Sequence, residues 1–252
     1  MRWRVPEWPA PTGVRALATL RDGGVSRTPY ESLNLAGHVG DAPTAVAANR
    51  KSLRDAAALP SEPKWLTQVH GTHVLDMDAL THDTPATARP ADACVTRKEG
   101  RVCAILTADC LPVLLAAETG DRVAAVHAGW RGLAGGVIEA TVAAMGAASG
   151  GLLAWLGPAI GPRHFQVGPE VREALLALDP GALAAFVPNE RGRFMADLYA
   201  LARRRLARAG VARVYGGGEC TYAQAADYFS HRREGPTGRQ ASLIWLEPTS
   251  SR

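Results

Sequence analysis

The stretch VCAILTADCLPVLLAAETGDRVAAVHAGWRG, from Val102 to Gly132, decides how the chain is expected to fold. It contains short apolar runs, and the last two of them flank the polar segment Glu118 to Asp121. Short apolar runs bounded by polar residues and glycine predict buried strands, and a polar segment of this length suits a hairpin loop. We therefore predict that Val113 to Ala117 pairs antiparallel with Val123 to Val126.

The register of this hairpin predicts a functional site. Folding the chain about the loop places Cys110 opposite Gly129 and His127 opposite Pro112. The Cys110 and His127 side chains then lie at the open end of the hairpin, close enough to share a metal ion or a proton.

A thiolate and two imidazoles suit Zn²⁺ or copper, and three protein ligands leave a fourth position open for chemistry. We take His70 as the third ligand, because it ends the strand-like run Trp65 to Val69 and precedes Gly71. His73 is the nearest competitor. A lone Cys or His is more often packed or exposed than bound to metal, so spacing by itself supports the site only weakly. Small and polar residues surround each of His70, Cys110 and His127. Glycine turns and a Trp130 packed in the core would explain one such segment without a metal site, but they explain the three together less well.

The whole sequence predicts a mixed α/β protein with one domain, residues 1–252, because 47% of the residues are apolar and one core of that size is feasible. The Pro- and Thr-containing stretch Thr81 to Pro90 is too short to link two domains and is expected to be a surface loop. Further strands are expected at Val14 to Leu20, Val102 to Leu106, Leu153 to Leu156 and Ser242 to Leu246. Helices are expected from the Asp41 to Thr44 segment to Leu59, at Ala134 to Ala148, and from a cap at Asp197 to Ala209.

Composition narrows the class of partner. No apolar run is long enough for a membrane span, and no leader-like segment is present. The formal charge is +4, but its densest group of arginines, 203–205 and 208, falls on the water-facing side of an expected helix, so no nucleic acid is predicted. The four cysteines follow no disulfide-scaffold or CxxC spacing, which favours a reducing compartment. We expect a cytoplasmic protein, with a monomer favoured, that acts on a small molecule.

Several blocks of the sequence, in order, resemble the bacterial multicopper polyphenol oxidoreductase (laccase-like) or YfiH family, which is related to the mammalian laccase domain-containing protein. The blocks are SLNLAGHVGD from Ser32, WLTQVHGTHV from Trp65, ADACVT from Ala91, LTADCLPVLL from Leu106, VAAVHAGWRG from Val123, WLGPAIGP from Trp155 and CTYAQAADYFSHRREGPTGRQASLIWL from Cys220. They span nearly the whole chain, which makes the resemblance specific.

The resemblance implies a four-layer α/β/β/α sandwich with mixed sheets. It also implies one zinc or copper ion per chain, held by the His of QVHG, the Cys of TADC and the His of HAGWRG, which are His70, Cys110 and His127 here. The activities attributed to the family fall into three classes. They are purine nucleoside phosphorolysis (of adenosine, inosine and methylthioadenosine) with adenosine deamination, laccase-like oxidation of phenols, and editing of peptidoglycan precursors.

Sequence chemistry ranks these activities. A trinuclear copper cluster needs many histidines, and seven His without an HxH pair supply too few, so strict laccase activity is disfavoured. Deamination fits a metal-activated water with Asp109 moving protons, although the HxE and PCxxC signature of zinc deaminases is absent.

Phosphorolysis needs donors around phosphate. Arg131, Arg232 and Arg239 are the candidates, with surface solvation as the alternative for each. Asn34 and Gln68 carry amides suited to a purine edge.

Two other classes of protein stay open. In one interpretation the protein is a hydrolase without metal, and Cys110 and His127 form a thiolate and imidazolium pair that cleaves an acyl or amide bond. In the other, the protein is a metal-stabilised binding module without turnover.

Overall fold

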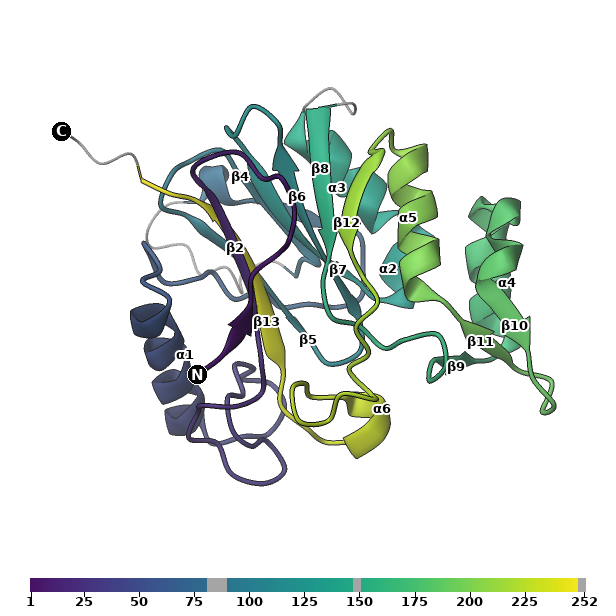
Figure 1. The fold of residues 1–252 in the computed structure, drawn as a ribbon, viewed down its shortest axis with the longest axis horizontal. Coiled ribbons are helices and arrows are strands. Elements are labelled where there is room, and N and C mark those ends of the chain that lie inside the picture. Colours follow the sequence, from purple (N-terminus) through teal and green to yellow (C-terminus); the bar gives the residue numbers. More distant parts are fainter. Residues whose placement is uncertain (81–89, 147–150, 249–252) are drawn as a thin grey trace.

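The computed structural model describes residues 1–80, 90–146 and 151–248, and its strands form three sheets within those ranges (Figure 1). A four-stranded antiparallel sheet contains, in spatial order, β1 (Trp3–Arg4), β2 (Val14–Thr19), β13 (Gln240–Leu246) and β5 (Val102–Thr107). A six-stranded mixed sheet contains β12 (Arg213–Gly216), β8 (Leu152–Leu156), β6 (Leu111–Ala117), β7 (Val123–Ala128), β4 (Ala93–Thr96) and β3 (Val74–Asp76). A small third sheet contains β10 (Phe186–Pro188), β11 (Phe194–Ala196) and β9 (Gln166–Val167).

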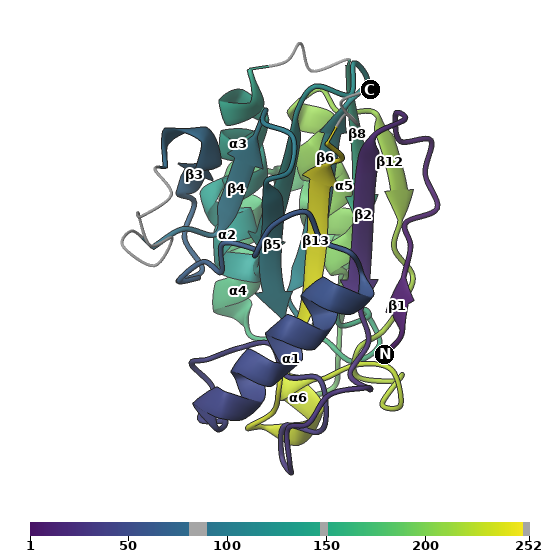
Figure 2. The ribbon, with the colours of Figure 1, turned by 90° about the vertical axis from the view of Figure 1, so that its left-hand side faces the viewer.

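The helices are α1 (Pro43–Ala56), α2 (Trp130–Gly135), α3 (Val137–Met145), α4 (Pro169–Leu178), α5 (Leu198–Arg208) and α6 (His231–Glu234), with 3-10 turns at Met77–Ala79 and Pro180–Ala185. Helices α1, α2, α3 and α5 cover the outer faces of the two large sheets, whereas α4 packs against α2 and α6 lies at one end of the molecule (Figure 1). Figure 2 shows α1 crossing in front of β13 and β5, while α2 and α3 lie behind the six-stranded sheet. The mixed α/β class expected from the sequence is confirmed.

Three apolar cores lie between these layers. One joins α1 to the four-stranded sheet, one lies between the two sheets, and the third joins the six-stranded sheet to α2, α3, α4 and α5. Strands β5, β6 and β7 are buried at every residue because both of their faces are covered. That double coverage explains why the sequence of these strands reads as almost continuous apolar runs.

The hairpin prediction is confirmed. Strands β6 and β7 pair antiparallel with Pro112 opposite His127, and the ladder continues to Ala116 opposite Val123. The predicted cap of α5 is also confirmed, because the Asp197 carboxylate accepts a hydrogen bond from the Ala200 amide at 3.0 Å.

Two expected elements differ from the structure. Trp65–Val69 is not a strand, because its hydrogen bonds go to separate segments and form no ladder. The Gln68 side chain bonds both backbone groups of Leu106, at 2.8 Å each, and the Val69 amide donates to the Asp92 carboxylate at 3.2 Å. The helix expected at Ala134 to Ala148 is two helices, α2 and α3, because Gly136 adopts φ +96° between them.

Of the expected surface loop, only Pro90 falls within the described residues, and the last two residues of the expected second helix, 147–148, fall outside them.

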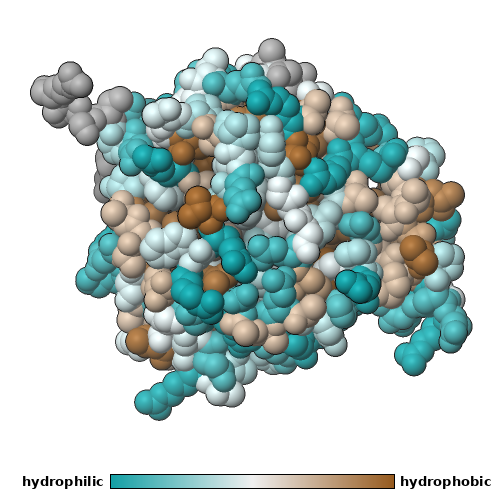
Figure 3. Space-filling view, in the orientation of Figure 1, coloured by the Kyte–Doolittle hydropathy of each residue, from teal (hydrophilic) through white to brown (hydrophobic). Residues whose placement is uncertain are grey.

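The surface gives no sign of a large apolar face in the view of Figure 3, where apolar side chains are scattered among polar ones. Among the described residues, no helix has the length and apolar character needed to span a membrane.

Candidate metal centre and its cavity

The open end of the β6–β7 hairpin carries Cys110 and His127. The pairing of Leu111 with Ala128 brings Cys110 opposite Gly129 at the next position. A Cβ atom at Gly129 would lie 2.9 Å from the His70 ring and 3.1 Å from the Cys110 sulfur. Only glycine therefore lets the third residue, His70, approach the hairpin end.

His70 reaches this point from a turn and not from the end of a strand. Its backbone adopts φ +60°, a left-handed conformation that is uncommon for residues other than glycine. The structure brings the His70, Cys110 and His127 ligand atoms within 4.8 Å of one another. The His70 Nε2 atom lies 3.7 Å from the Cys110 sulfur, and the two imidazole rings are 4.7 Å apart. His73, the competitor, turns its Nδ1 atom to the Pro90 carbonyl at 2.8 Å.

The Asp92 carboxylate fixes both histidines. One oxygen, Oδ1, accepts hydrogen bonds from the His70 amide and from His127 Nδ1, both at 2.8 Å. The other, Oδ2, accepts from the Val69 amide at 3.2 Å and the Gly71 amide at 2.7 Å. Asp92 is fully buried. Sequence reasoning missed it, since the only local signal is an acidic residue just before the buried strand β4.

Electrostatics favour the ligand form of the thiol. Burial raises the pKa of Cys110, but His127 and then His70 outweigh it and lower this pKa to about 6. Burial lowers the pKa of His127, but Cys110 and Asp92 outweigh it and raise that pKa to about 9. Burial raises the pKa of Asp92, and hydrogen bonds from His127 and Gly71 bring it below its ordinary value. These shifts favour a Cys110 thiolate beside a protonated His127, and the sulfur and two imidazoles make a donor set that fits a metal ion when His127 gives up its Nε2 proton.

A cavity of about 310 Å³ opens in front of these residues. It is lined by His38, Gln68, His70, Leu106, Thr107, Ala108, Cys110, His127, His231 and Arg239. Of the predicted substrate residues, the structure brings Gln68 and Arg239 to the cavity. His38 and His231 were not anticipated, because nothing in their local sequence separates them from solvent-exposed histidines.

Three predicted substrate residues do not line the cavity. Arg131 is exposed and stacks on the Trp130 ring at 4.3 Å. Arg232 directs its guanidinium to the Gln166 carbonyl at 3.0 Å. Asn34 is fully buried, and its side-chain oxygen accepts a hydrogen bond from the Arg239 amide at 3.0 Å.

Asp109 lies beside the cavity and adopts φ +94°. Its Oδ1 atom accepts from the Thr221 hydroxyl at 2.6 Å, and its Oδ2 atom accepts from the Arg232 amide at 2.7 Å. Asp109 thus ties the segment before Cys110 to the segment containing α6.

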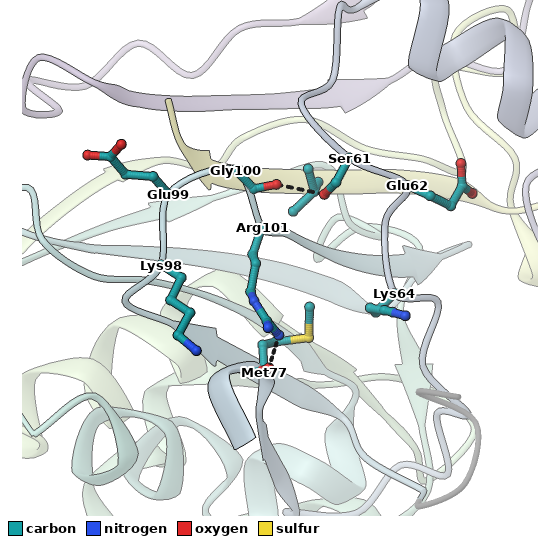
Figure 4. A pocket seen from close by; sticks show the side chains of 9 residues that line it. Ser61, Glu62, Lys64, Met77, Lys98, Glu99, Gly100 and Arg101 are labelled. Carbon is teal, nitrogen blue, oxygen red and sulfur yellow. Dashed lines mark hydrogen bonds between the residues drawn. The ribbon is translucent and has the colours of Figure 1, made fainter. Parts of the chain in front are cut away.

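A second cavity, of about 530 Å³, lies away from this site (Figure 4). It is lined by Ser61, Glu62, Lys64, Met77, Lys98, Glu99, Gly100, Arg101 and Val102. None of these residues brings an imidazole or a thiol, and the Arg101 guanidinium is bonded to the Met77 carbonyl. We therefore assign the chemistry to the smaller cavity.

Comparison with known proteins identifies the family of this chain. A family model described as multi-copper polyphenol oxidoreductase laccase matches residues 15–247. The purine nucleoside phosphorylase YfiH of Escherichia coli K12 is 52% identical over 242 residues, covering 96% of this chain and 98% of the relative. A purine nucleoside phosphorylase of Pseudomonas aeruginosa is 52% identical over 246 residues, covering 97% and 98%.

Solved structures show the same fold. A Neisseria meningitidis protein superposes with a TM-score of 0.92 at 46% identity, covering 98% of this chain and 100% of that one. YlmD from Geobacillus stearothermophilus gives 0.91 at 32% identity, covering 98% and 97%. The chain therefore belongs to the multi-copper polyphenol oxidoreductase laccase family.

Proposed function

We propose that this protein is a metal-dependent purine nucleoside phosphorylase that acts on adenosine, inosine and methylthioadenosine. The observation that carries the proposal is the His70, Cys110 and His127 group at the wall of a cavity of about 310 Å³. That volume lies at the lower end of the range of small-molecule sites. Relatives that are 52% identical over nearly the whole chain and are named purine nucleoside phosphorylases support it.

The metal would be held by His70, Cys110 and His127, one ion per chain. Zn²⁺ is the ion we favour over copper, because one thiolate and two imidazoles form a usual zinc set with a fourth position free. A bound Zn²⁺ would supply Lewis-acid chemistry at the cavity wall. The protein's own part is to keep Cys110 deprotonated and to hold the His127 ring through Asp92.

Gln68 and Arg239 are the substrate-binding residues we retain at the cavity. The Gln68 amide is already paired with the Leu106 backbone, so it would give a nucleoside only its remaining hydrogen-bonding capacity. Asn34 and Asp109 are better placed as positioning residues. Asn34 holds the Arg239 backbone, and both oxygens of Asp109 already accept hydrogen bonds.

Adenosine deamination at the same site is a second activity that we propose, since it needs only water and the same metal chemistry. A third candidate is amide hydrolysis of a peptidoglycan precursor by Cys110 and His127 without metal. The low pKa of Cys110 and the high pKa of His127 favour that candidate. Polyphenol oxidation is the least favoured, because the described residues contain one His and Cys cluster suited to a metal.

The test is elemental analysis of protein purified without added metal, beside a chromatographic assay with adenosine in the presence and absence of phosphate. We expect about one zinc per chain. We also expect phosphate-dependent release of adenine, and loss of that release with a chelator. Inosine formed without phosphate would indicate deamination. Protein that lacks metal but retains full activity on an amide substrate, and loses it when Cys110 is alkylated, would assign it to the cysteine hydrolases.

We place the enzyme in the cytoplasm, because a metal-binding thiol has to stay reduced and the four cysteines are free in the structure.

A further inference from the structure

The guanidinium of Arg239 lines the cavity, and among the described residues no carboxylate forms an ion pair with it. Burial lowers the pKa of Arg239, although Cys110 and Asp109 lie near enough to raise it in part. Its Nη1 atom donates to the Thr237 carbonyl at 2.8 Å and to the Gly238 carbonyl at 2.9 Å. The Nε and Nη2 atoms have no hydrogen-bond or ion-pair partner in the part of the chain that the structure describes. This free edge is the one through which arginine binds an oxyanion with two parallel hydrogen bonds.

Buried contacts hold this arginine in place. Its amide donates to the Asn34 side chain at 3.0 Å, and its carbonyl accepts from the Leu35 amide at 3.2 Å. The next residue, Gln240, begins β13 and pairs with Thr107 at the end of β5. The guanidinium is therefore carried by a fixed backbone and not by a free loop.

Thr107 supplies a second donor at the same end of the cavity. It lines the cavity, it is 2% exposed, and its hydroxyl has no hydrogen-bond partner. A buried hydroxyl without a partner costs free energy, and such groups are rare in folded proteins unless a ligand or water satisfies them.

The cavity also has the charge that suits an anion. Its lining includes one guanidinium, the imidazoles of His38, His70, His127 and His231, and one thiol, but no carboxylate. The pKa of His38 is lowered by burial and then by Arg239 and Arg50, which shows that His38 sits in the field of positive charge. The Cys110 thiolate is the one anionic group of this lining, and a bound metal ion would neutralise it, which would leave the Arg239 guanidinium as the charge that faces an incoming anion.

We propose that Arg239 and Thr107, with His38 beside them, form an oxyanion subsite of the cavity, and that its ligand is inorganic phosphate. The choice of phosphate rests on the proposed function, because phosphorolysis consumes it. In that reaction a phosphate oxygen forms a bond to C1′ of the ribose as the bond from C1′ to the purine nitrogen breaks. The purine leaves with the electron pair and takes the proton of hydrogen phosphate, which gives ribose 1-phosphate and the free base.

The test measures binding of inorganic phosphate by isothermal titration calorimetry in the zinc-loaded wild type, R239Q, T107V and R15Q. Arg15 is exposed and paired with Glu247, so R15Q is a control that loses the same charge elsewhere. We expect phosphate affinity to fall roughly 10- to 100-fold in R239Q and roughly 2- to 10-fold in T107V, with R15Q unchanged. In the adenosine assay, the KM for phosphate should rise in R239Q while the KM for adenosine stays within about twofold.

Each outcome decides a separate point. If R239Q folds and its phosphate affinity stays within about twofold of the wild type, the subsite is overturned. If R239Q does not fold, an unchanged phosphate affinity in T107V overturns it. Wild-type protein that binds phosphate through Arg239 but releases no base would leave the subsite standing and remove the proposed function. Adenosine 5′-monophosphate that binds through Arg239, with no binding of inorganic phosphate, would overturn phosphate as the ligand.

Discussion

Replacing Asp92 with Asn should weaken metal binding while leaving the fold intact. Each oxygen of the Asp92 carboxylate accepts two hydrogen bonds, and all four donors are N–H groups. Asn has one accepting oxygen and one NH₂ group of nearly the same size. In either orientation of the amide, two of the four donors therefore face an NH₂ group.

Both orientations harm the site. If the amide nitrogen faces His127 Nδ1, the ring is driven to carry its proton on Nε2, the nitrogen that is free for a metal. If it faces the Val69 and Gly71 amides, the turn that holds His70 at φ +60° loses its support. Loss of such partners of metal-binding histidines typically costs 10- to 100-fold in affinity. We expect D92N to lose about 1.4–2.7 kcal/mol of zinc binding, the same range expressed as free energy.

The assay is competition for zinc with a chromophoric chelator, run beside thermal unfolding of the metal-free proteins. The matched control is D179N, because Asp179 is also buried but pairs with Arg204, away from the cavity. Zinc affinity of D92N within about twofold of the wild type, with both proteins folded, would refute the positioning role. Equal loss of zinc affinity in D92N and D179N would show a general effect of destabilisation.

Three further substitutions test the site and its surroundings. C110A should lose both metal and turnover with its thermal unfolding nearly unchanged, because Cys110 is partly exposed, and activity lost only in proportion to unfolding would count against a catalytic role. G129A should lower zinc content, because the added Cβ would meet the His70 ring at 2.9 Å, and full occupancy would show that the ring moves aside at little cost. Glu234 tests pH dependence: burial raises its pKa, but Thr237, Arg21 and Arg233 lower it to about 2. Its stabilisation, on the order of 2–3 kcal/mol, is present above the ordinary glutamate pKa and is lost as pH falls toward 2. The difference in unfolding free energy between wild type and E234Q should therefore shrink between about pH 5 and pH 3, and a constant difference would contradict this assignment.

The hairpin could be predicted from sequence because its determinants are local. Two apolar runs flank the polar loop from Glu118, and that arrangement leaves one register in which both strands stay apolar on both faces. Cys110 and His127 then fall at the same end, as the structure shows. The confirmed cap at Asp197 is local in the same sense, because its partner is three residues away.

The rest of the site depends on contacts that are distant in the sequence. Asp92 acts on His70 and His127, which are 22 and 35 residues away, so no local pattern reveals it. His70 was expected at the end of a strand, but the segment before it joins no sheet and leads into a left-handed turn at His70. Asn34 and Arg239 are 205 residues apart, and no sequence pattern links them.

The metal centre and the oxyanion subsite are held in the same way, and this has a consequence for mutagenesis. Asp92 and Asn34 are both fully buried, and each accepts or donates four hydrogen bonds. Asp92 serves the metal ligands, whereas Asn34 serves the backbone of Arg239. Breaking the hydrogen bonds of a buried polar side chain lowers the free energy of unfolding more than breaking those of an exposed one. Natural variation should therefore be tolerated at the exposed Arg131 and not at Asp92 or Asn34. The two functions should also separate: weakening the contacts of Asp92 should lower metal affinity first, and weakening those of Asn34 should lower phosphate affinity first.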